Sequence, residues 1–151
     1  LSLHDALPIL PEDLKALQWV ALGSNVFNAM IPVYPGVDKM PEYLSKAYVK
    51  PTTENFYWVN RIIGALADAH FYENQSNIER YQLSVDRKLY EMIRKFDQEF
   101  QEKEPEDKKA FFEAANQEIS DFIQEKTTEL LDKVLFTSSC LMRNGFSRSD
   151  A

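Results

Sequence analysis

Side chains capable of covalent chemistry are few in this chain. Cys140 is the only thiol, and it follows Thr137, Ser138 and Ser139 near the end of a helical pattern. A thiol nucleophile needs a neighbouring base, and no histidine lies near Cys140 in the sequence. We therefore expect Cys140 to be a buried or half-buried free cysteine, and not a nucleophile.

His70 is the only histidine after the first ten residues, and it lies beside Phe71 and Tyr72 at the end of an apolar stripe. A zinc site needs several His or Cys ligands, and none lies close by. The sequence therefore predicts a structural histidine at a helix end, where its charge could favour the helix dipole.

A run of carboxylates surrounds Pro105. Its members are Glu99, Glu102, Glu104, Glu106 and Asp107. Paired carboxylates act as acid and base only when one of them is desolvated. Because these residues flank a proline in a polar turn, we expect a solvated connection between two helices.

The segment WVALGSNVFNAMIPVYPG offers the best candidate for a site. An apolar run over residues 17–23 leads into Ser24 and Asn25, and a second apolar run covers residues 29–34. Polar residues at a strand end beside a sheet are common functional positions. An ordinary hairpin loop would have the same pattern, so both interpretations stay open on the pattern alone.

Both apolar runs have the length and composition of strands. Residues 24–28 would connect them as a hairpin loop. Pro32 lacks a backbone donor, so the second strand is expected at an edge, a bulge or a strand end. The residues that follow allow a short helix over 41–47.

Three helical patterns fill the rest of the chain. The first runs over residues 53–71, and the second is expected to begin at a capping box of Ser76 and Glu79. Pro105 separates the second from the third, which would break near the TSSC segment or run on to Met142. Short connections predict antiparallel neighbours. The fold class is therefore α+β, mostly helical, with a short β portion followed by three long helices.

Composition excludes several classes of protein. The net charge is −7 and no Lys/Arg-rich run occurs, which disfavours a nucleic-acid partner. No apolar stretch reaches the roughly 18 residues that a membrane helix needs, so no membrane partner is predicted. A single cysteine fits a reducing compartment, and we expect a cytoplasmic protein. Phosphate-loop, dinucleotide-binding and nucleophile-elbow motifs are missing from the sequence.

The opening LSLHDALPIL fits neither a signal peptide nor a regular element. Residues 1–9 can be back-translated to CTTTCCCTACACGACGCTCTTCCGATC, which resembles the end of a short-read sequencing adapter. We therefore expect residues 1–9 to be non-native and the native protein to extend upstream. Two strands are also too few for a sheet that buries both of its faces, so a partner sheet is expected to be missing.

The chain resembles a known family over nearly all of residues 10–151. The segments that carry the likeness are QWVALGSNVFNAMIPVYPGVDKMPEYL, FYWVNRIIGALAD and the closing NGFSRSDA. In their order and spacing they are similar to the C-terminal portion of bacterial cysteine dipeptidases, which are N-terminal-nucleophile hydrolases.

This resemblance implies an αββα sandwich for the intact protein and residues 10–151 as part of one dipeptidase domain. It implies a dipeptide substrate, no metal and no cofactor. The nucleophile would be an N-terminal cysteine upstream of this chain, with its own α-amino group as base. Cys140 cannot take that role, so the fragment alone is expected to be inactive. Ser24 and Asn25 would then approach the substrate, with Tyr34 as a pocket wall.

A second hypothesis is a non-catalytic helical module that binds another protein. The two hypotheses differ in what they predict for Trp19, Val20 and Leu22. An enzyme fragment would leave these side chains bare where the rest of a sheet belongs, whereas a complete module would cover them. The sequence leaves open whether identical copies assemble into a homo-oligomer.

Overall fold

Three long helices follow a small sheet in this chain. The computed structural model describes residues 12–24, 26–46 and 48–143, so the predictions for residues 1–9, Asn25 and the closing tail lie outside the described residues. The elements are α1 (Glu12–Lys15), β1 (Gln18–Val20), β2 (Ile31–Val33), α2 (Glu42–Ser45), α3 (Phe56–Ala69), α4 (Phe71–Lys103) and α5 (Lys108–Cys140). The predicted β portion followed by three helices is confirmed.

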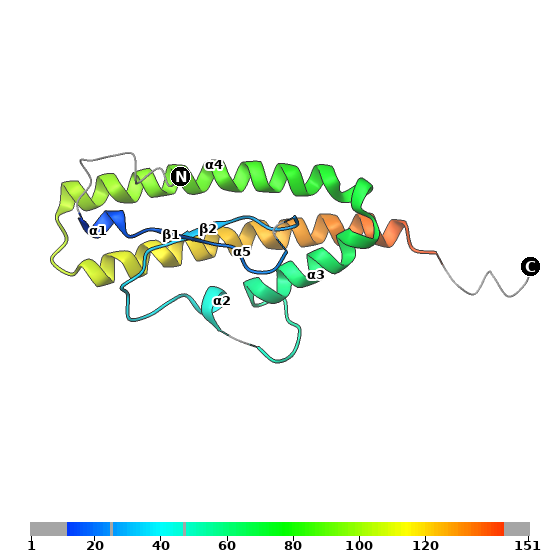
Figure 1. The fold of residues 1–151 in the computed structure, drawn as a ribbon, viewed down its shortest axis with the longest axis horizontal. Coiled ribbons are helices and arrows are strands. Elements are labelled where there is room, and N and C mark those ends of the chain that lie inside the picture. The colour runs from blue at the N-terminus through cyan, green and yellow to red at the C-terminus, as the bar shows by residue number, and fades with distance from the viewer. Residues whose placement is uncertain (1–11, 25, 47, 144–151) are drawn as a thin grey trace, which may run out of the picture.

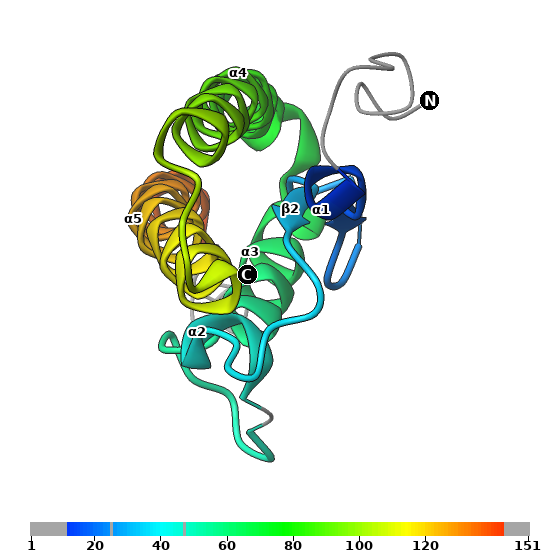
Figure 2. The same ribbon diagram turned by 90° about the vertical axis from the view of Figure 1, so that its left-hand side faces the viewer.

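The helices and the sheet surround one core. Helices α4 and α5 lie side by side and run in opposite directions, as predicted, joined by a short loop at one end (Figure 1). Seen end-on, α4, α5, α3 and the strands enclose a common centre (Figure 2). Buried apolar side chains from all of these elements fill it. None of the helices within the described ranges is long and apolar enough to cross a membrane.

The two strands pair antiparallel, with Trp19 opposite Pro32. Both predicted strands are present but shorter than expected, so residues 21–30 connect them instead of 24–28. Pro32 is tolerated because each strand of a two-stranded sheet has an unpaired edge. Trp19, Val20 and Leu22 are half-buried, and the ring of Trp19 lies 5.0 Å from that of Tyr90 on α4. This face is therefore only partly covered. It matches neither the bare face expected of an enzyme fragment nor the covered face expected of a complete module.

Helix α3 begins at a side-chain cap. The Asn55 side chain accepts a hydrogen bond from the backbone N–H of Trp58 at 3.2 Å and donates to the carbonyl of Lys46 at 2.6 Å. Such a cap satisfies one of the backbone donors that a helix start leaves unpaired. The predicted stripe is confirmed from Phe56 to Ala67, with Phe56, Val59, Ile63 and Ala67 all buried. Its predicted end at Phe71 is wrong, because α3 ends at Ala69 and Phe71 is exposed at the start of α4.

The predicted helix start at Ser76 is wrong. Helix α4 begins at Phe71, and Ser76 is exposed within it. His70 alone separates α3 from α4, which confirms a histidine at a helix end. The earlier start is stabilised by Asn74, which is fully buried and donates to the carbonyl of His70 at 3.1 Å and to Ser138 Oγ at 3.3 Å. Tertiary contact with α5 therefore overrides the local capping signal.

The acidic connection between α4 and α5 is solvated, as predicted. Pro105 lies between the two helices, and Asp107 caps α5 by accepting from the N–H of Ala110 at 3.0 Å. The expected break in the TSSC segment is absent, because α5 continues through it to Cys140. Ser138 is buried there and donates to the carbonyl of Leu66 on α3, which joins this last turn to the core.

One side-chain amide holds the strands to the helices. Asn116 of α5 is fully buried; its Oδ1 accepts from the N–H of Tyr34 at 2.8 Å, and its Nδ2 donates to the carbonyl of Tyr34 at 2.9 Å. Tyr34 directly follows β2. Both backbone groups of this buried residue are therefore satisfied by a residue 82 positions away.

Replacing Asn116 should destabilise the chain strongly. Asn116→Ala leaves two buried backbone groups without a partner, at about 1–3 kcal/mol each, so we expect a loss of about 2–6 kcal/mol in the free energy of unfolding. Urea denaturation followed by circular dichroism measures this loss. Gln117→Ala is the control, because Gln117 is the exposed neighbour on the same helix. A loss no larger than in this control would contradict the role of Asn116.

Candidate functional site

The loop between the strands is the candidate site, because it contains the predicted Ser24. Gly23 has φ +96°, a conformation that side chains rarely adopt, and it turns the chain out of β1. The carbonyl of Ser24 then accepts from the N–H of Phe27 at 3.1 Å, which closes the turn. Ser24 is exposed, whereas Asn25 lies outside the described residues. The Ser24 hydroxyl is thus on an accessible turn.

Two buried asparagines, Asn28 and Asn60, lie next to this turn. A Cβ atom built on Gly23 would lie 3.8 Å from Asn28 Nδ2 and 3.8 Å from Asn60 Cβ. Asn28 donates to the carbonyl of Leu22 at 2.6 Å. Asn60 donates to the carbonyl of Phe56, one turn back along α3, at 2.8 Å. Each amide nitrogen is therefore paired with a backbone carbonyl.

The corresponding amide oxygens have no such partners. Oδ1 of Asn28 and Oδ1 of Asn60 are buried and accept no hydrogen bond among the residues that the structure describes. An unpaired buried acceptor costs about 1–3 kcal/mol. Such groups need an explanation in a folded protein, and a functional role is one of them. The turn therefore combines an exposed hydroxyl with two unsatisfied acceptors behind it.

Contacts with α3 and α4 hold the loop in place. Gln82 Nε2 of α4 donates to the carbonyl of Asn28 at 2.8 Å and to that of Val26 at 3.3 Å. Phe27 packs on Gly64, where an added Cβ would come within 3.3 Å of its ring, and meets the ring of Phe71 edge-on. The loop is thus anchored at both its backbone and its aromatic side chain.

Tyr34 lies in the core, separated from Ser24 by β2. Only 1% of Tyr34 is exposed. Its ring stacks on Phe112 at 5.0 Å and meets Phe96 edge-on at 6.3 Å. Burial, together with the nearby carboxylate of Asp97, raises the pKa of Tyr34 far above its ordinary value. Within the described residues, therefore, the structure does not bring Tyr34 together with Ser24.

The other chemically interesting residues lie elsewhere. Cys140 is exposed at the end of α5, so the expectation of a buried or half-buried cysteine is wrong. Ser138, two positions earlier, is the buried residue of this last turn, and Cys140 lies on its exposed side. No group of three or more His, Cys, Asp or Glu side chains in the described ranges is arranged to hold a metal ion.

Sequence reasoning missed Asn28, Asn60 and Gln82. Asn60 did carry a signal, because it occupies a buried position next to Val59 in an otherwise apolar stripe. Asn28 and Gln82 gave none, since their roles depend on contacts between residues 54 positions apart.

Comparison with known proteins places this chain among peptidases. The profile of peptidase family C69 matches residues 5–84. Probable dipeptidase A of Streptococcus pyogenes serotype M18 (strain MGAS8232) is 38% identical over 143 residues, which is 95% of this chain and 29% of the relative. A dipeptidase of Bifidobacterium longum (strain NCC 2705) is 32% identical over an alignment of 188 residues, which covers 99% of this chain and 35% of the relative.

A more distant relative is dipeptidase A of Lactobacillus helveticus, 29% identical over 88% of this chain and 28% of the relative. The likeness to bacterial dipeptidases that the sequence motifs indicate is thereby confirmed. The chain spans only about a third or less of the length of these curated relatives.

The buried Tyr34 should make the chain sensitive to alkaline pH. Because the folded state raises the pKa of Tyr34, the native state holds this proton more tightly than the unfolded state. The stabilisation is complete below the ordinary tyrosine pKa of about 10 and falls above it, by at most about 1.4 kcal/mol per pH unit. Urea unfolding at a series of pH values from neutral to alkaline measures the fall.

Tyr34→Phe keeps the ring and removes the proton, so stability should decline less steeply above pH 10 in this variant. Tyr72→Phe is the control, because Tyr72 is 87% exposed. Equal alkaline slopes in the parent chain and in Tyr34→Phe would contradict the prediction.

Proposed function

The chain belongs to peptidase family C69, and from this membership we propose that the intact protein hydrolyses dipeptides through a cysteine nucleophile. The observation that carries the proposal is the likeness to proteins named dipeptidases over 95% of this chain. The nucleophile would be a mature N-terminal cysteine in the part of the relatives that this chain does not span. Residues 10–151 would form the C-terminal part of that dipeptidase domain, and the protein would act in the cytoplasm.

The proposed reaction proceeds in two steps. The α-amino group of the N-terminal cysteine takes the thiol proton, and the sulfur attacks the peptide carbonyl carbon. The peptide C–N bond breaks, the amine leaves with a proton, and an acyl-enzyme remains. Water then attacks the thioester carbonyl and releases the second amino acid. No metal or cofactor takes part in these steps.

In this proposal the present chain contributes substrate positioning. The exposed Ser24 hydroxyl and the neighbouring Asn25 side chain are suited to hydrogen bonds with the polar ends of a dipeptide. Asn28, Asn60 and Gln82 would hold the turn from behind and so fix the position of Ser24. Tyr34 lies deeper and would support the adjoining strand instead of forming a pocket wall.

The β portion is consistent with a larger sheet. Within the described residues β1 pairs only with β2, so its second edge is unpaired. Trp19, Val20 and Leu22 remain half-buried beside it. Additional strands from the rest of the relatives' length would extend this edge, as an αββα sandwich requires.

A test of the nucleophile uses the intact protein with Cys140→Ser. Hydrolysis of dipeptides with free termini should be unchanged by this substitution, since Cys140 is exposed and lies at a helix end. An alkylating reagent should still abolish hydrolysis in this variant, because the reactive thiol lies elsewhere. Amino-acid release, followed by mass spectrometry of the alkylated peptide, makes the measurement. Hydrolysis that survives alkylation, or that disappears with Cys140→Ser, would refute the proposal.

A second test addresses the loop. Ser24→Ala and Asn25→Ala in the intact enzyme each remove a hydrogen bond worth about 0.5–1.5 kcal/mol, so kcat/KM should fall about 2- to 10-fold. Ser139→Ala is the control, because Ser139 is an exposed serine whose hydroxyl bonds only within its own helix. Unchanged kcat/KM in both loop variants would exclude the loop while leaving the peptidase activity itself intact.

A further inference from the structure

A pocket of about 270 Å³ lies between α4 and α5, and it shares no residue with the loop of residues 21–30. Each helix lines it with one face over two turns. Arg80, Tyr81 and Ser84 come from α4, and Lys126, Glu129 and Lys133 come from α5. Pockets for drug-sized ligands are about 300–1,000 Å³, so this one suits a smaller ligand.

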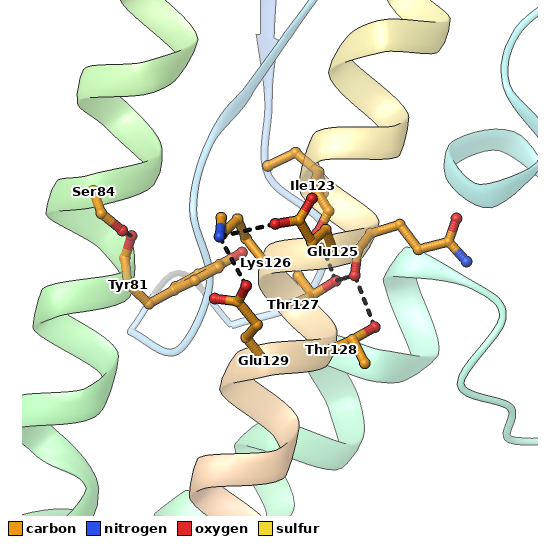
Figure 3. A network of polar contacts seen from close by, with 9 residues as sticks. Tyr81, Ser84, Ile123, Glu125, Lys126, Thr127, Thr128 and Glu129 are labelled. Carbon is orange, nitrogen blue, oxygen red and sulfur yellow. Dashed lines mark hydrogen bonds and ion pairs between the residues drawn. The ribbon is translucent and has the colours of Figure 1, made fainter.

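The lining of the pocket is positively charged. Arg80, Lys126 and Lys133 contribute three cations against the single carboxylate of Glu129, although the whole chain has a net charge of −7. Lys126 is held by Glu129 at 2.8 Å and by Glu125 at 3.1 Å (Figure 3). Among the described residues neither Arg80 nor Lys133 forms an ion pair. The pKa of Glu129 is lowered mainly by its hydrogen bond with Lys126 and further by the charge of Lys133, so the three cations of the pocket share one carboxylate.

Tyr81 forms part of the buried side of the pocket. Tyr81 is 6% exposed, and its hydroxyl has no hydrogen-bond partner within the described residues. Figure 3 shows its side chain pointing from α4 toward α5, beside Lys126. The hydroxyl oxygen itself is shielded from solvent, so it does not face the open part of the pocket. Burial also raises the pKa of Tyr81. The Ser84 hydroxyl, by contrast, already donates to the carbonyl of Tyr81 at 3.0 Å.

We propose that this pocket binds a small ligand through an oxyanion group, either a phosphate or a carboxylate. Arg80 and Lys133 would provide the charged contacts from opposite helices. Arg side chains suit such groups because their planar fork can bind two oxygens at once. The proposal rests on the pocket alone and is independent of the hydrolytic activity.

The test is calorimetric titration of the 151-residue chain with inorganic phosphate and, separately, with succinate, at a constant ionic strength set by potassium chloride. Saturable binding of at least one of the two is expected, and the tighter one identifies the oxyanion. Arg80→Gln with Lys133→Gln should weaken binding by about 10- to 100-fold, which corresponds to the loss of one charged hydrogen bond or more. Circular dichroism checks that each variant stays folded.

Two further variants test the roles of Glu129 and Tyr81 in binding. Glu129→Gln should tighten binding, because it removes the only carboxylate that lines the pocket and releases Lys126. Tyr81→Phe should leave binding unchanged, since the hydroxyl that it removes is shielded from the pocket.

Arg87→Gln with Lys88→Gln is the matched control, with the same charge change at exposed positions of α4. Equal weakening in this control and in the Arg80/Lys133 pair would overturn the proposal, because simple electrostatic screening would then explain the binding. The proposal also fails if neither anion binds more tightly than chloride.

Discussion

The buried amide of Asn116 is the interaction on which the arrangement of this chain depends. In a wider sheet, the N–H and C=O groups of Tyr34 would pair with a neighbouring strand. Here a side chain from α5 satisfies both groups, at 2.8 and 2.9 Å. The end of β2 is thereby fixed on α5, and the Tyr34 ring is held between α4 and α5 against Phe96 and Phe112. Since β1 pairs with β2, the position of the candidate loop follows from this contact.

Helix α5 repeats this use of buried polar groups along its length. Thr127 bonds the Tyr43 hydroxyl at 2.6 Å, and Ser138 contacts both Asn74 and the carbonyl of Leu66. Near its start, Glu113 also accepts from the backbone N–H groups of residues 38 and 39, although these two bonds are exposed. Buried polar groups stabilise only when they are paired, so each contact specifies one arrangement of the preceding segments on α5. The helix thus selects the fold as well as filling its core.

Local pattern predicted the elements of this fold better than their junctions. The stripes around Val59 and Phe96, the break at Pro105 and both strands could be predicted, since apolar spacing and proline act within a few residues. The start of α4 could not, because Asn74 and Ser138 are 64 residues apart and their contact outweighs the cap at Ser76. The site divides in the same way. Ser24 stays a prediction that rests on its position after an apolar run, whereas the placement of Asn28 beside Gly23 depends on tertiary contacts.

Electrostatics distinguishes the pocket between α4 and α5 from ordinary surface pairing. The chain has 24 acidic and 17 basic side chains, so carboxylates are available to most cations. Lys126 follows this expectation, because it pairs with two carboxylates. Lys95 of α4 likewise pairs with Glu118 of α5 at 3.3 Å. Arg80 and Lys133 line one pocket without such partners in the described residues, where like charges repel. Glu129 is the one carboxylate that these cations share in the pocket. An anion between the two helices would convert the remaining repulsion into attraction.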